Sequence, residues 1–190
     1  MWMRVSSHGL PVPKKYLHDF RCKNRGHHCH RRHQARELYN IRLEKDIQAE
    51  FKKFDIMEGV AVLRDQRGVV ISIGDTLLFD SGSSEVRREA RPLLATIASL
   101  IRKYQRSIII EGHTDNIPLR GSKYSSNLEL SSARASRTFQ FLSEEEAVRP
   151  EGMSAAGYGE YRPVASNATV EGRARNRRVD IIFAAKKDET

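Results

Sequence analysis

The side chains that could do chemistry gather just after a short apolar run, Ile108 to Ile110. This run is followed by glutamate, glycine, histidine, threonine and then Asp115. Ligand crevices usually lie where polar residues follow the end of a buried strand. Asn127 and Arg134 stand seven residues apart, close to two helical turns, so a helix presents both on one face. If that face meets the loop that holds Asp115, a carboxylate and a guanidinium line one open groove.

An acid and an arginine on opposite walls of a groove have two interpretations. They can form a structural salt bridge with no ligand between them. They can also clamp a zwitterion, in which case Asp115 accepts hydrogen bonds from a ligand ammonium group and Arg134 forms two parallel bonds with a ligand carboxylate. The spacing leaves both interpretations open.

The elements that must position these side chains alternate between strand and helix. β-Branched runs at 60–63 and 69–73, joined by a turn, predict a hairpin. Further strands are predicted at 107–111, 153–156 and 179–183, with an optional short one at 77–79, and helices at 93–101, 127–146 and 169–176. We predict an α/β fold, an α+β sandwich in which a mixed β-sheet carries helices packed on one face.

Composition divides the chain into four parts. The globular domain covers residues 59–185, and residues 186–190 form a tail. A narrow apolar stripe among charges predicts a helix over 37–58, which either connects the domain to another part or caps it. Residues 1–36 contain nine of the 33 Lys and Arg residues but one of the 24 acidic residues, so most of the net charge of +9 belongs to a segment that we expect to be poorly ordered. The rest of the chain is nearly balanced, which gives little attraction for nucleic acid.

Histidine and cysteine residues crowd between Cys22 and His33. A structural zinc site usually pairs two short ligand motifs across a longer loop, whereas this cluster lies in a single stretch. We therefore expect adventitious metal binding there rather than a physiological site, and we predict neither a metal nor a cofactor for the protein.

Several motifs in a fixed order resemble the OmpA-like peptidoglycan-binding domain. They are LFDSGS at 78–83, IEGHTDNIP at 110–118, SNLELSSARA at 126–135, GYGE at 157–160 and EGRARNRRV at 171–179. The resemblance covers roughly residues 69–183. Within that family, the chain is most similar to the periplasmic domain of MotB-type flagellar stator proteins.

The resemblance implies non-covalent, non-catalytic binding of the diaminopimelate residue in the stem peptides of peptidoglycan. The acid that the family uses falls on Asp115 and its arginine on Arg134, the two residues of the clamp. Its asparagine falls on Asn127, and the first arginine of its Asn-Arg-Arg motif falls on Arg177, which also lies beside the ligand in the family. The resemblance further implies a homodimer that anchors a cell-envelope or flagellar stator complex to the cell wall.

A MotB-type protein is periplasmic and tethered to the inner membrane. It has an amino-terminal membrane helix with an acidic proton-binding residue, and it meets a MotA-type partner through that helix. Residues 1–36 take this place here without a hydrophobic segment, and the longest apolar stretch, residues 93–101, is about half of a membrane span. We therefore expect the native membrane segment to be missing upstream, through a truncated, misassigned or out-of-frame start.

Three alternatives to a stator anchor stay open at this point. An enzyme would use His113 and Asp115 as metal ligands or as a base–acid pair, but the sequence places no third ligand or nucleophile beside them. Nucleic-acid binding would rest on residues 1–36, which contain no recognised motif. A general envelope tether or a secretion-apparatus anchor would use the same domain in another complex.

Overall fold

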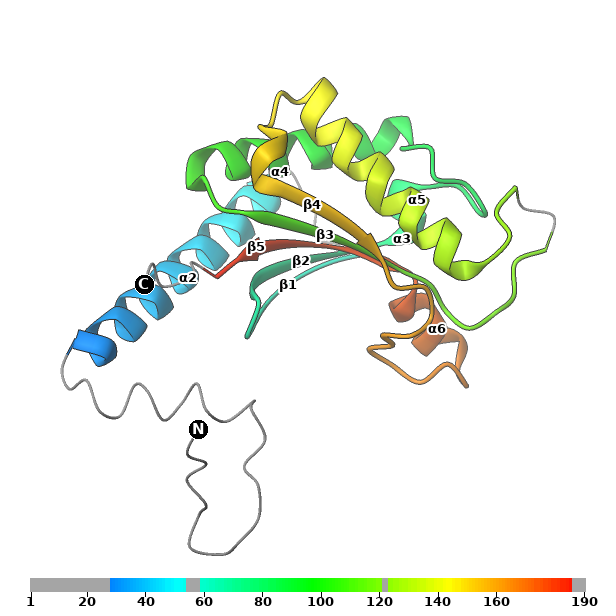
Figure 1. Cartoon of the computed structure of the whole chain (residues 1–190), viewed down its shortest axis with the longest axis horizontal. Helices are drawn as coiled ribbons and strands as arrows, with labels where there is room; N and C mark the ends of the chain where they lie inside the picture. Colours follow the sequence, from blue (N-terminus) through cyan, green and yellow to red (C-terminus); the bar gives the residue numbers. More distant parts are fainter. Residues whose placement is uncertain (1–27, 54–58, 121–122, 186–190) are drawn as a thin grey trace, which may run out of the picture. The chain divides into compact units, whose positions relative to one another are not determined.

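A computed structural model describes residues 28–53, 59–120 and 123–185, with the side chains of the first stretch from residue 37 onward (Figure 1). The chain divides into two compact units, residues 1–39 and 40–190. Residues 28–39 of the first unit are helical. The side chains of the Cys22 to His33 cluster lie outside the described residues.

Five strands of the second unit form one mixed sheet in the order β1-β2-β5-β3-β4. The strands are β1 Val60–Asp65, β2 Gly68–Gly74, β3 Ile108–His113, β4 Met153–Gly157 and β5 Arg178–Ala184. β3 and β4 pair in parallel, and every other pair is antiparallel. The predicted fold class is confirmed, and the last described strand lies in the middle of the sheet.

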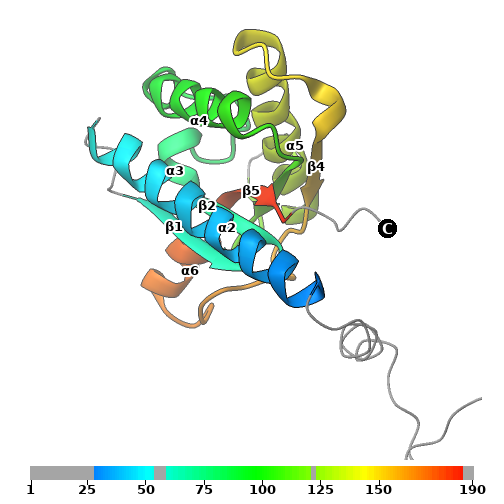
Figure 2. The ribbon, with the colours of Figure 1, turned by 90° about the vertical axis from the view of Figure 1, so that its left-hand side faces the viewer.

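The long helices of this unit share one hydrophobic core with one face of the sheet (Figure 1). They are α4 Arg91–Tyr104, α5 Asn127–Gln140 and, from residue 40 onward, α2 His28–Lys53. Val69, Ile71 and Ile73 of β2 point into that core, because alternate side chains of a strand share a face. The short helix α6, Val170–Asn176, lies on the other side of the sheet from α4 in both views (Figures 1 and 2).

Helix α2 packs on the domain along a single apolar stripe. Leu43, Ile47 and Phe51 are spaced four residues apart, and all three are fully buried. Asp46, which also lies on this helix, accepts a hydrogen bond from the hydroxyl group of Tyr104 at the end of α4. These are the contacts of a capping helix over residues 40–53, while residues 54–58 lie outside the described residues.

The structure differs from the predicted elements in three places. Helix α2 begins at His28, inside the segment that we expected to be poorly ordered. Residues 77–79 do not form a strand, because Asp75–Leu78 form the short helix α3, closed by a hydrogen bond from the amide of Phe79 to the carbonyl oxygen of Asp75. The helix expected over 127–146 changes from α to π geometry over Phe141–Glu145. Two 3₁₀ turns complete the described elements, at Arg88–Ala90 and Pro150–Gly152.

Helix α5 lies directly against the backbone of β3 and β4. A Cβ atom on Gly112 would lie 2.1 Å from the carbonyl oxygen of Ser131, and one on Gly157 would lie 2.3 Å from the backbone nitrogen of Ser132. Only glycine fits at these two positions, because any side chain would overlap the helix backbone. The two glycines thus bring α5 close to the loop that follows β3. None of the described helices is long and apolar enough to cross a membrane.

Candidate functional site

The site forms where the end of β3 meets the beginning of β5. These strands are antiparallel neighbours, and His113 at the end of β3 is paired with Arg178 at the start of β5. Asp115 follows β3 by two residues, and Arg177 directly precedes β5. The Nη1 atom of Arg177 lies 2.7 Å from Oδ2 of Asp115, and the other carboxylate oxygen accepts the amide hydrogen of Ile117 at 3.0 Å. We call Asp115 and Arg177 the ligand pair.

Arg134 reaches the same region from α5 but is enclosed. Its Nη1 atom donates to Asp75 at 2.9 Å, and its Nε atom donates to the backbone carbonyl of Ser83, also at 2.9 Å. The guanidinium group stacks over the ring of Phe79, 5.1 Å from the ring centroid. The residue is 3% exposed, so protein groups rather than water surround and stabilise its charge.

Asp75 connects the two arginines, and sequence reasoning missed it. Besides its bond with Arg134, its other carboxylate oxygen lies 3.6 Å from Nε of Arg177. The result is a chain of alternating charges, Asp115–Arg177–Asp75–Arg134. The one signal in the sequence was an acidic residue just after the predicted strand at 69–73, the same kind of position that drew attention to Asp115.

The pKa values in this chain follow from burial and charge. Burial raises the pKa of Asp75 above its usual value, although Arg134 and Arg177 oppose that shift. Burial lowers the pKa of Arg134, against the attraction of Asp75. Burial also works against the charge of Arg177, but its hydrogen bond to Asp115 and the charge of Asp75 outweigh burial and raise its pKa. Both arginines stay protonated, because guanidinium groups do not lose their proton in proteins.

Asn127, the first residue of α5, holds the surrounding loops together. Its side-chain amide donates to the backbone carbonyl of Asp115 at 3.2 Å and to that of Ile117 at 3.0 Å. The same amide lies 3.0 Å from the carboxylate of Glu160, in the loop after β4. Asn127 therefore fixes the loop that carries Asp115 relative to α5.

In the structure, Asn127 and Arg177 each contact Asp115, and Arg134 is linked to Arg177 only through Asp75. The predicted groove is corrected in one respect. Arg134 forms its salt bridge with Asp75 rather than facing Asp115, and Asp115 and Arg134 are only 7% and 3% exposed, so these two side chains do not line an open groove. The most accessible charge of the four-residue chain is Arg177, with 34% of its side chain exposed.

Comparisons with known proteins identify the family of this domain. The sequence pattern of the OmpA family matches residues 78–177. Motility protein B of Bacillus subtilis is 40% identical over 148 residues, covering 77% of this chain and 56% of that protein, so the chain spans little more than half the length of this relative.

Solved structures include two similar periplasmic or wall-associated domains. The cell wall anchor of the T6SS from Pseudomonas aeruginosa is 38% identical with a TM-score of 0.64, over 73% of this chain and 95% of that one. The periplasmic domain of Helicobacter pylori MotB is 29% identical, also with a TM-score of 0.64, over 70% of this chain and 87% of that one. From its fold, its motifs and these relatives, the chain belongs to the OmpA family.

Proposed function

We propose that this chain binds the stem peptide of peptidoglycan without reacting with it and anchors an envelope complex, a flagellar stator in the first instance, to the cell wall. The observation that carries this proposal is the charge chain Asp115–Arg177–Asp75–Arg134, because it presents an acid beside a partly accessible guanidinium. Diaminopimelate offers the complementary groups, an ammonium and a carboxylate on one carbon.

The ligand pair is expected to open around such a head group. The ligand ammonium replaces Arg177 as the partner of Asp115, and the ligand carboxylate takes the fork of Arg177. Arg134 lies behind Asp75 and is bonded to the carbonyl of Ser83, so it reaches the same carboxylate only when that loop moves. Asn127 keeps the Asp115 loop in place during this exchange.

A single stem peptide held by a few ionic contacts binds weakly, because partly exposed ion pairs contribute little net free energy. Strong anchoring then needs several stems to be held at once. A homodimer meets this need, because once one subunit has bound a stem, the repeating polymer presents further stems to the other subunit at a high effective concentration. In the proposed setting the protein is periplasmic, tethered to the inner membrane by an amino-terminal segment that also meets a MotA-type partner.

Two substitutions with matched controls test the site. Asp115→Asn removes the charge that would meet the ligand ammonium, and Arg177→Lys keeps the charge but loses the planar fork that fits a carboxylate. Each is expected to reduce co-sedimentation with purified sacculi about tenfold, which corresponds to about 1.4 kcal/mol. Asp80→Asn and Arg175→Lys change exposed residues of the same types and should bind like the native chain. Free diaminopimelate should compete for binding, and cadaverine, which has two ammonium groups but no carboxylate, should compete less.

Equal sedimentation of the native chain and both site variants would refute the assignment of the ligand pair. If the native chain binds sacculi but free diaminopimelate does not compete, the group that the chain recognises must lie elsewhere in the polymer.

A secretion-apparatus anchor is the second candidate, since the T6SS cell wall anchor of Pseudomonas aeruginosa is 38% identical and matched over 95% of its chain. Binding to sacculi does not separate the two candidates. Deletion of the gene does: a stator anchor is needed for swimming, whereas a secretion anchor is needed for release of secreted effectors.

A further inference from the structure

The chain that leads to Arg177 lies on the other side of the sheet from α4 (Figure 1). It is the last part of the connection from β4 to β5, and it consists of a loop over residues 164–169 followed by α6. We call residues 164–176 the α6 unit. Its last residue, Asn176, directly precedes Arg177, so the contacts that hold this unit also hold the backbone that carries the accessible arginine of the ligand pair.

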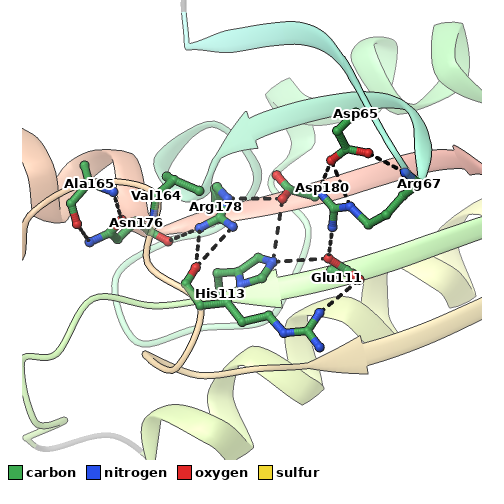
Figure 3. Close-up of polar contacts among 10 residues, drawn as sticks. Asp65, Arg67, Glu111, His113, Val164, Ala165, Asn176, Arg178 and Asp180 are labelled. Carbon is green, nitrogen blue, oxygen red and sulfur yellow. Dashed lines mark hydrogen bonds and ion pairs between the residues drawn. The ribbon is translucent and has the colours of Figure 1, made fainter. Parts of the chain in front are cut away.

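Asn176 binds the loop of the α6 unit with every hydrogen-bonding position of its side-chain amide. Its Oδ1 atom accepts the backbone amides of Val164 and Ala165, both at 2.9 Å, as Figure 3 shows. Its Nδ2 atom donates to the backbone carbonyl of Ala165 at 2.9 Å and to Oδ1 of Asn167 at 2.8 Å. An amide group has two donor hydrogens and two acceptor lone pairs, so all four are used. The residue is 0% exposed, and a buried polar group that is fully bonded in this way makes its surroundings rigid.

The loop also contacts α6 along the length of the helix. The hydroxyl oxygen of Thr169 accepts the amide of Gly172 at 3.0 Å, and the guanidinium group of Arg173 donates to the backbone carbonyl of Asn167 at 2.9 Å. A Cβ atom on Gly172 would lie 1.9 Å from the carbonyl oxygen of Ser166. A helix of seven residues is marginal by itself in water, so α6 depends on these contacts with the loop.

The backbone of Arg177 is bonded on both sides. Its amide donates to the carbonyl oxygen of Arg173 in α6, and its own carbonyl oxygen accepts the amide of Asp75, both at 3.0 Å. The next residue, Arg178, is 7% exposed and donates to the backbone carbonyl of Asn176 at 3.3 Å (Figure 3). Arg177 therefore lies between two buried neighbours, and its side chain alone is partly exposed.

A fixed backbone matters for a residue such as Arg177, because its long side chain can adopt many rotamers. A side chain that must be ordered when the ligand arrives lowers the affinity. In the structure the guanidinium group already has a direction, since its Nη1 atom lies 2.7 Å from the carboxylate of Asp115. That contact requires the end of α6 to stay at one place relative to the loop after β3.

We propose that Asn176 is a positioning residue for Arg177, which fixes the α6 unit and thereby presents the guanidinium group in the direction that the ligand carboxylate needs. Asn176 acts through Arg177 rather than on the ligand itself. Without its side-chain amide, the loop loses four bonds to the end of α6, and Arg177 samples several directions. The ligand must then order it, which weakens binding. This inference rests on the proposed function, because it concerns the arginine that the ligand pair contributes.

Asn176→Ala tests the inference, with Asn40→Ala as its matched control. Asn40 is also a buried asparagine, but it accepts a bond from Arg106 at 2.8 Å, and Arg106 reaches the carbonyl of Ala184 at the opposite end of β5. Asn176→Ala is expected to reduce co-sedimentation of the folded chain with sacculi about fivefold, the effect of having to order one long side chain on binding. Asn40→Ala should bind like the native chain, even where urea unfolding shows that both variants are less stable.

A second measurement does not depend on sacculi. The bond to Asp115 should shift the side-chain NMR signals of Arg177 away from those of free arginine and slow the exchange of its protons with water. Asn176→Ala should move these signals toward the free values, and Asn40→Ala should not. If the native chain binds no sacculi but the Arg177 signals depend on Asn176, the proposed function fails while the positioning role stands. If the native chain does bind, a folded Asn176→Ala chain that keeps either the native affinity or the native Arg177 signals overturns the inference.

Should Asn176→Ala fail to fold, Asn167→Ala provides the second variant. It removes one acceptor of the Asn176 amide and leaves the other three bonds in place. Binding should then fall about twofold, at the lower end of the same ordering cost, and the Arg177 signals should move in the same direction. Native binding and native Arg177 signals in the Asn167→Ala chain would overturn the inference.

Discussion

Arg134 and Arg177 carry the same charge in very different surroundings. Asp75, a backbone carbonyl and the ring of Phe79 enclose the guanidinium of Arg134, whereas about a third of the Arg177 side chain stays exposed. An enclosed charge that loses its partner costs far more than an exposed ion pair contributes. Asp75 and Arg134 should therefore matter chiefly for the stability of the fold and Arg177 chiefly for affinity, whereas Asp115, which is as buried as Asp75, should contribute to both.

Asp75→Ala is expected to lower the free energy of unfolding by about 3 to 5 kcal/mol, because it leaves Arg134 buried without a counter-ion. Asp75→Asn should cost less, since its amide oxygen still accepts a bond from Arg134 and burial already raises the pKa of the native carboxyl group, making the ionised form costly. Urea unfolding measures both. Asp80→Ala, at an exposed acid nearby, is the control, and equal stability of the Asp75→Ala and Asp80→Ala chains would contradict the enclosed-charge interpretation.

At the scale of elements, the position of α5 depends on how closely its backbone approaches β3 and β4. Gly112 and Gly157 allow that approach, because a Cβ atom at either would overlap the helix backbone. Asn127 and Arg134 are carried by this helix, and Asp115 by the loop after β3. The distance between helix and strand thus decides whether the polar groups of the site meet.

Gly112→Ala is expected to push α5 away from β3 and to lower the free energy of unfolding by about 1 to 3 kcal/mol, with sacculus binding reduced in the remaining folded protein. Gly152→Ala makes the same chemical change where no atom lies within 4 Å of the new Cβ atom. The control should therefore keep native stability in thermal unfolding and native binding. If the Gly112→Ala and Gly152→Ala chains unfold at the same temperature, α5 accommodates a Cβ atom at residue 112, and the close-approach interpretation is wrong.

Much of the sheet could be predicted from local pattern. The β-branched runs of β1 and β2, the buried run of β3 and the apolar spacing of α4 each indicate their own structure, because neighbouring residues determine it. The role of Asp75 could not be predicted in this way, since it depends on the end of β2 meeting the residue before β5, about a hundred positions later in the chain. The burial of Arg134 depends on the loop at 80–83, and a pattern of helical spacing contains no information about that loop.

At the scale of the whole molecule, most of the positive charge and the candidate site belong to different segments of the chain. Most of the net charge of +9 belongs to residues 1–36, whereas the compact unit that contains the site is residues 40–190. Long-range attraction for polyanions follows net charge and is screened by salt. Binding to nucleic acid, where it occurs, should therefore belong to the first segment, and binding to sacculi should belong to the second unit.

Deletion of residues 1–36 is expected to abolish salt-sensitive binding to DNA and to leave sacculus binding within about twofold of the native value, since the ligand pair lies in the other unit. Filter binding over a range of salt concentrations measures the first, and co-sedimentation measures the second. A truncated chain that keeps its affinity for DNA would place a nucleic-acid surface on the domain itself.

The central position of β5 has a consequence for how the protein is made. β1 and β2 form one part of the sheet and β3 and β4 another, and the two parts pair only through β5. On the ribosome, the growing chain therefore carries two unjoined parts of the sheet until β5 has been synthesised. Arg177 directly precedes β5, so the pairing that joins the two parts of the sheet and the contact between Asp115 and Arg177 depend on the same late segment of the domain.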